Sequence, residues 1–79
     1  MVYKYKMQSE GFKQRLEIAK NNSEKIKIIF QYPASPRAVI RKGIVLKVHS
    51  DSFDFKDQLN GIMTFSYNFI CEISEWEGE

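Results

Sequence analysis

Apolar and polar residues alternate in short segments separated by turn residues, and this pattern is what most constrains the fold of the 79-residue chain. Successive side chains of a strand point to opposite faces, so a half-buried strand is apolar at every second position. Residues 25–32 show the pattern, and four further segments follow up to residue 76. We therefore predict a mostly β fold with five strands over residues 25–76.

The boundaries between these segments coincide with residues that favour turns. Pro33 and Pro36 end the first strand, because proline cannot donate a hydrogen bond to a ladder. Later strands are separated by Ser50-Asp51 and by Asn60-Gly61, which supplies the positive φ angles that a hairpin turn requires. Tyr67-Asn68-Phe69 is too short for an α-helix, so it is expected to form a single 3₁₀ turn before the last strand.

Gly43 interrupts the longest predicted strand, which runs over residues 38–49. Glycine within a strand pattern marks a bulge or a bend where a sheet curls on itself, so we predict a small barrel with Gly43 at such a bend. Beyond it, Ile44, Leu46 and Val48 are assigned to one face. The inward positions predict a buried core of Leu16, Ile28, Phe30, Ile44, Leu46, Val48, Phe53, Phe55, Phe65 and Ile73.

One α-helix is expected ahead of the strands, over residues 9–21. Phe12, Leu16 and Ala19 have the i, i+4, i+7 spacing that forms one apolar face. Asn21-Asn22 is expected to end the helix, because asparagine tolerates the left-handed conformation common just past a helix end.

The length indicates a single domain over residues 1–79, in which residues 1–8 are an arm or an additional edge strand. No stretch approaches the ~20 apolar residues of a membrane span, and no signal peptide is expected. The lone Cys71 cannot form an internal disulfide, which fits a reducing compartment. The sequence thus predicts a cytoplasmic protein without a membrane partner.

Residues suited to catalysis or metal binding are sparse. A cysteine or serine nucleophile needs a neighbouring base, and His49 is the only histidine. A pair of His49 and Cys71 stays open as an alternative, although cysteine in an apolar strand is usually a small buried hydrophobe. Asp51, Asp54 and Asp57 lack the glycine of a calcium loop, and there is no glycine-rich phosphate loop. We predict no enzyme, no cofactor and no metal site.

Charge is distributed unevenly along the chain, although the net charge is only +2. Residues 1–47 contain 11 of the 12 Lys and Arg with three acidic residues, giving +8, whereas residues 48–79 carry −6. A basic face on the helix and first two strands would attract phosphates or an acidic protein. The candidate nucleic-acid contacts are Lys25, Lys27, Arg37, Arg41, Lys42 and Lys47, together with Tyr32 as a base-stacking residue.

Aromatic residues exceed what so small a core can easily enclose. Tyr67, Phe69 and Trp76, with Tyr3 and Tyr5, are therefore candidates for an exposed patch, which favours a protein partner. Edge strands of an unclosed barrel could also pair between chains, forming a homodimer. The sequence favours a protein-interaction or self-associating module, with nucleic-acid binding as the alternative.

The order of one helix, five strands and a short turn before the last strand resembles the SH3-like and Sm-like small barrels. Within this group the chain resembles WYL domains at residues 16–19, 26–30 and 65–70. That resemblance implies nucleotide or nucleic-acid sensing. However, the Trp-Tyr-Leu of the family falls near Ser52-Phe53-Asp54-Phe55, and the arginines of its closing segment fall near Ser66 and Phe69.

The chain also resembles the Veg family of short proteins from low-GC Gram-positive bacteria. The similar segments are Gly43-Ile44-Val45-Leu46, Ser52-Phe53-Asp54-Phe55 and Phe65-Ser66-Tyr67. These are framework residues, and the family has no settled biochemical activity. Both resemblances therefore imply a fold rather than a reaction.

Overall fold

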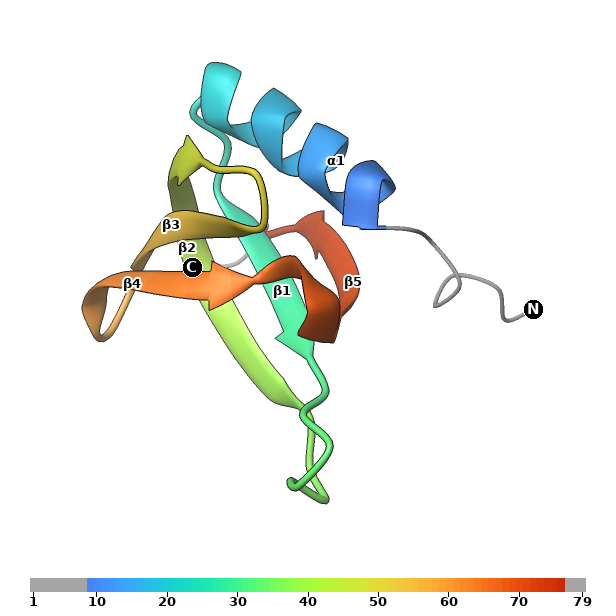
Figure 1. The fold of residues 1–79 in the computed structure, drawn as a ribbon. Coiled ribbons are helices and arrows are strands. Elements are labelled where there is room, and N and C mark those ends of the chain that lie inside the picture. The colour runs from blue at the N-terminus through green and yellow to red at the C-terminus, as the bar shows by residue number, and fades with distance from the viewer. Residues whose placement is uncertain (1–8, 77–79) are drawn as a thin grey trace.

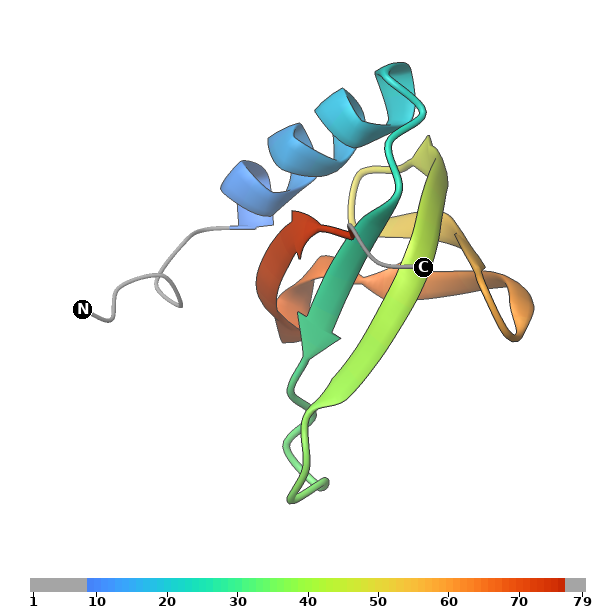
Figure 2. The same ribbon diagram turned by 180° about the vertical axis from the view of Figure 1, so that it is seen from behind.

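A computed structural model describes residues 9–76, which form one α-helix, one short 3₁₀ helix and one sheet (Figures 1 and 2). The prediction of a mostly β fold with five strands and an N-terminal helix is confirmed. The predicted arm or edge strand at residues 1–8, with Tyr3 and Tyr5, lies outside the described residues. The elements in chain order are α1 (Ser9–Asn21), β1 (Ile26–Phe30), β2 (Val39–Val48), β3 (Ser52–Asp57), β4 (Gly61–Ser66), the 3₁₀ helix η2 (Tyr67–Phe69) and β5 (Ile70–Glu75).

The five strands form one antiparallel sheet in the order β4-β3-β2-β1-β5. The first four strands pair with their neighbours in sequence, and β5 returns to pair with β1. η2 carries the chain from one edge strand of the sheet, β4, to the other, β5 (Figure 1). The sheet therefore curls on itself, as expected of a small barrel. α1 lies across one end of the sheet, and the β1–β2 loop projects from the opposite end.

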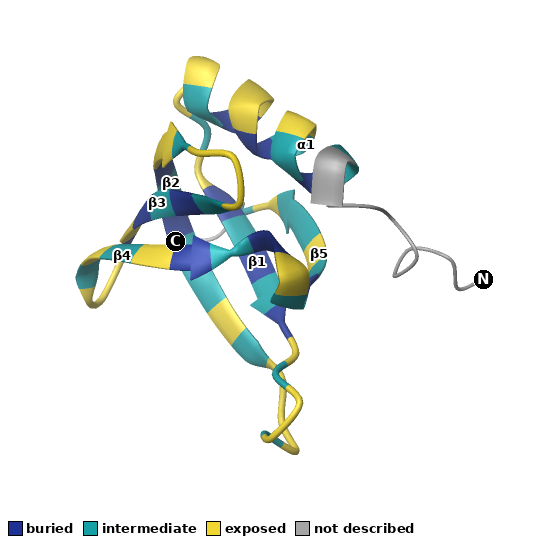
Figure 3. Ribbon diagram, in the orientation of Figure 1, coloured by how far each residue is buried: buried dark blue, intermediate teal, exposed yellow. Residues whose placement is uncertain are grey.

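The core lies on the inward face of the curled sheet, beneath α1 (Figure 3). Phe65 lies among other aromatic rings, with its centroid 4.7 Å from that of Phe30 and 5.8 Å from that of Phe53. The helix adds the apolar face that its sequence predicts. Six members of the predicted core are buried: Leu16, Ile28, Phe30, Phe53, Phe55 and Phe65.

A β-bulge in β2 accounts for the core residues that the sequence assigned wrongly. The pairing of β2 with β3 shifts between Val45 and Lys47, so Leu46 is an extra residue on the bulged strand. The residues of β2 that face the core are therefore Val45 and then Val48, and Leu46 between them is 38% exposed. Ile44 is half-buried rather than part of the core. Val48 and Ile73 are also half-buried, but they pack against the core as expected.

Gly43 does not lie at this bulge, so the prediction of a bulge at that position is wrong. It has a regular partner on each side, Ile26 of β1 and Asp57 of β3. A Cβ atom at Gly43 would lie only 2.0 Å from the backbone oxygen of Lys56. The close approach of two backbones thus requires a glycine at this position.

The helix ends where the sequence predicts, but through a different residue. Ser23, rather than an asparagine, has the positive φ of 54°. The Glu24 amide donates to the Ala19 carbonyl at 2.9 Å, and the Ser23 amide donates to the Lys20 carbonyl at 3.2 Å. These two bonds form a Schellman motif, which satisfies carbonyls that the helix end leaves unpaired.

The hairpin turn between β3 and β4 also differs in detail from the prediction. Gly61 has a φ of 81°, whereas Asn60 does not have a positive φ. The turn is held instead by Asp57, whose Oδ2 accepts hydrogen bonds from the Leu59 and Asn60 amides, both at 3.0 Å. A buried aspartate that accepts amides two and three residues ahead fixes the turn without a second left-handed residue.

Candidate functional site

Three of the candidate cations gather on the outward face of the sheet, and two of them lie beside Trp76. Lys27 and Lys42 are directly paired across β1 and β2. The Lys25 ammonium lies 5.6 Å from the centroid of the Trp76 ring, and the Lys42 ammonium lies 5.7 Å from it. Like charges opposite one another in a sheet are destabilising, and cation–π contact with an indole offsets part of that cost. We call Lys25, Lys27 and Lys42 the lysine cluster.

The other candidate cations do not join this cluster. Arg41 alternates with Lys42 and so lies on the opposite face of β2, with its guanidinium 5.9 Å from the Phe65 ring centroid. Its Nη1 is 3.9 Å from Oδ1 of Asp57. Arg37 lies in the β1–β2 loop, and Lys47 follows the bulge, on the part of β2 that pairs with β3. The six predicted cations therefore do not form one continuous basic face.

The candidate aromatic residues are mostly engaged within the protein. Tyr67, predicted for an exposed patch, is only 3% exposed, and its hydroxyl donates to the His49 carbonyl at 2.6 Å. The Tyr32 ring stacks on Phe30 with a centroid distance of 5.9 Å. Phe69 lies 5.0 Å from Tyr32 and packs against the core. The prediction that Tyr67 belongs to an exposed patch with Phe69 and Trp76 is thus wrong. Tyr32, the predicted base-stacking residue, already stacks on Phe30 within the protein.

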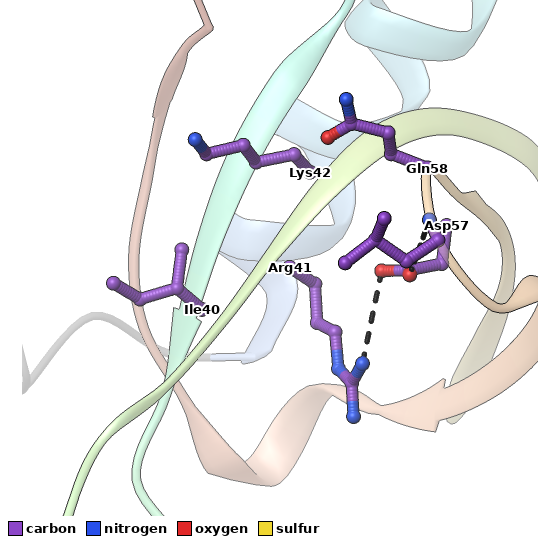
Figure 4. A pocket seen from close by; sticks show the side chains of 6 residues that line it. Ile40, Arg41, Lys42, Asp57 and Gln58 are labelled. Atoms are coloured by element: carbon purple, nitrogen blue, oxygen red, sulfur yellow. Dashed lines mark hydrogen bonds and ion pairs between the residues drawn. The ribbon is translucent and has the colours of Figure 1, made fainter.

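A cavity that the sequence did not predict lies between β2 and the β3–β4 turn (Figure 4). Its volume is about 300 Å³, and it is lined by residues 40–42 of β2, by Asp57 at the end of β3 and by residues 58–59 of the turn. Two of its apolar side chains are open to solvent, since Ile40 is 54% exposed and Leu59 is 85% exposed. Figure 4 shows Ile40 and Lys42 projecting from one side of β2 and Arg41 from the other.

The cavity exists because β2 extends beyond the end of β3. Pairing between the two strands ends at Gly43 and Asp57, and the last bond joins the Gln58 amide to the Lys42 carbonyl at 2.8 Å. Residues 39–41 are paired with β1 on one side, and on the other side no β3 residue faces them. Leu59 could have indicated this site, because a leucine in a polar turn has no core to fill. It was not among the residues predicted for a site.

A second polar group lies near the other end of the β2–β3 pair. His49 Nε2 is 3.2 Å from Oδ2 of Asp54, and the Thr64 hydroxyl donates to Oδ1 of Asp54 at 2.8 Å. The Thr64 hydrogen bond, followed by the one from His49, lowers the pKa of Asp54. All three side chains lie at the surface, so the group links β3 to β4 rather than forming an enclosed site. The His49 ring is thus bonded to Asp54, and within residues 9–76 it has no hydrogen bond to Cys71, the pair that the sequence left open.

Over residues 9–76 no three His, Cys, Asp or Glu side chains are grouped so as to hold a metal ion. No helix in that range is long and apolar enough to cross a membrane.

Comparison with family models, curated proteins and solved structures finds no match for this chain. The SH3-like, Sm-like, WYL and Veg resemblances therefore stay predictions.

Proposed function

We propose that this protein is a non-catalytic protein-interaction module that binds an extended acidic segment of a partner. The observation that carries the proposal is the cavity between β2 and the β3–β4 turn, with Ile40 and Leu59 exposed at it and the lysine cluster beside it. Lys42 belongs to the lysine cluster and also lines the cavity, so one ligand could contact the cluster and the cavity together.

The apolar side chains supply the affinity. Large exposed hydrophobic residues at a concave site are typical of protein contacts, and Ile40 and Leu59 have this setting. Full burial of an isoleucine or leucine side chain stabilises a complex by about 1.5–3 kcal/mol. At about 300 Å³ the cavity is at the lower limit for small-molecule sites, which favours one or two side chains of a peptide.

The backbone and the charges define the kind of segment. On the side of β2 away from β1, the backbone of Ile40 is beyond the β3 ladder, so an extended peptide can continue the sheet there. Lys27 and Lys42 are directly opposed, and carboxylates of the ligand would relieve their repulsion. Oδ2 of Asp57 does not offer the ligand a free acceptor, because that oxygen already accepts hydrogen bonds from two turn amides. An acidic segment with one apolar side chain therefore complements the surface.

Selection of random peptides displayed on phage, followed by calorimetry with the synthesised peptides, tests this function. We expect enrichment of sequences that combine a large apolar residue with Asp or Glu. Ile40→Ser should weaken their binding about tenfold, which corresponds to ~1.4 kcal/mol. Ile18→Ser is the matched control, because Ile18 is 51% exposed on α1, away from the cavity. Equal losses in both variants, or no enrichment, would contradict the proposal.

Nucleic-acid binding stays the alternative because two lysines flank Trp76 on the outward face. Trp76 is half-buried, and cations beside an accessible aromatic ring are typical of sites for single strands. The cluster contains only three cations, and each phosphate contact contributes ~0.7 to the salt dependence. A plot of the logarithm of the binding constant against the logarithm of the salt concentration should therefore have a slope of about −2. Titration of a labelled single-stranded oligonucleotide should then show that Trp76→Ala and Lys42→Ala weaken binding. An absence of binding at low salt would remove this alternative.

A further inference from the structure

We infer that two copies of this chain associate by antiparallel pairing of their β4 strands. β4 is one edge of the sheet, and among the described residues its backbone is bonded to β3 alone. Every second residue of an edge strand directs its N–H and C=O away from the sheet. The inference goes beyond the proposed function, because β4 is separate from the residues that line the cavity.

The composition of β4 leaves this edge unprotected. Its sequence, Gly-Ile-Met-Thr-Phe-Ser, contains no charged residue and no proline. Proteins usually block edge strands with lysine, proline or inward charges, and β4 has none of these. Ile62 is 70% exposed, and Thr64 is also exposed on the same outward face. An edge of this kind is suited to receiving another strand.

The opposite edge differs in a way that identifies the partner strand. β5 carries two exposed carboxylates, Glu72 and Glu75, and self-pairing would bring like charges together. A two-fold axis places each residue of a strand opposite a residue of the identical strand. An uncharged strand meets no repulsion in that arrangement. The neutral β4 is therefore complementary to itself, while β5 is not.

Six residues are enough for such an interface to have a normal ladder. Strands in globular proteins are typically about five to six residues long, and β4 has six. The outward face of the joined strands would carry Ile62 and Thr64 from each copy. Pairing would thus satisfy the free backbone groups and reduce the exposure of Ile62 in the same step.

Sedimentation velocity and hydrogen exchange over a range of concentrations test the inference. We expect the mass to rise from one chain toward two, with the amides of residues 61–66 becoming protected as it does. Ile62→Lys should weaken association about tenfold or more, since it places two cations near each other across the pairing. Ile18→Lys makes the same change at a similarly exposed position on α1 and should leave the mass unchanged.

Three results would overturn the inference. They are a monomer at every concentration, a dimer without new protection over residues 61–66, and equal effects of the two lysine variants. Because hydrogen exchange is measured on the unaltered protein, a folding defect of Ile62→Lys does not affect that result. Loss of peptide binding in Ile40→Ser is measured independently, so the proposed function and the β4 pairing can fail separately.

Discussion

Phe30→Ala is expected to lower the free energy of unfolding by about 3–5 kcal/mol, the usual cost of removing a buried aromatic ring. Phe30 is fully buried on the central part of the sheet, in a strand flanked by β2 and β5. Its ring contacts Phe65 and Tyr32, so the cavity left behind borders two other aromatic rings. A domain of 79 residues has a total stability of roughly 4–12 kcal/mol, so the variant should be largely destabilised.

Chemical denaturation followed by tryptophan fluorescence measures this loss. Ile18→Ala is a suitable control, because a half-exposed residue on the outer side of α1 should change stability by no more than about 0.5 kcal/mol. A Phe30→Ala protein with a midpoint equal to that of the control would mean that the inward face of β1 has been assigned incorrectly.

The elements of the fold were predictable because their signals are local. Alternation placed β1 and β3 correctly, and the short Tyr67-Asn68-Phe69 segment forms the expected 3₁₀ helix. The bulge in β2 was not predictable, since Ile44, Val45 and Leu46 are three apolar residues in a row. Such a run fits a strand with Val45 facing the core as well as one with Ile44 and Leu46 facing it. Only the pairing with β3 selects Val45 as the inward residue.

The candidate site was less predictable because it depends on contacts between elements. Ile40 and Leu59 come together only because β2 is longer than β3. Lys42 and Arg41 are neighbours in sequence, but the strand sends them to opposite faces, where one meets Trp76 and the other meets Phe65. Tyr67 was expected at the surface, yet the His49 carbonyl accepts its hydroxyl and lets the ring be buried. A charge count along the chain contains none of this information.

Gly43→Ala is expected to destabilise the protein by roughly 3 kcal/mol, near the upper end for overpacking. The added methyl group would lie 2.0 Å from the Lys56 carbonyl oxygen, and a backbone atom cannot move aside as a flexible side chain can. Relief would require β2 and β3 to separate near Asp57, whose carboxylate holds the neighbouring turn. The loss should therefore be accompanied by faster hydrogen exchange at the Leu59 and Asn60 amides.

Gly61→Ala separates this steric effect from the conformational preference of glycine. Gly61 has a φ of 81°, but a Cβ atom there would have no neighbour within 4 Å. Its replacement should cost only the ~1–2 kcal/mol of a left-handed alanine, and Gly61→Asn should cost less because asparagine tolerates that conformation. Gly43→Asn should bring no such recovery, since the obstacle at Gly43 is the Lys56 backbone rather than φ. Comparable recovery by asparagine at both positions, measured by thermal unfolding, would contradict the close approach of β2 and β3.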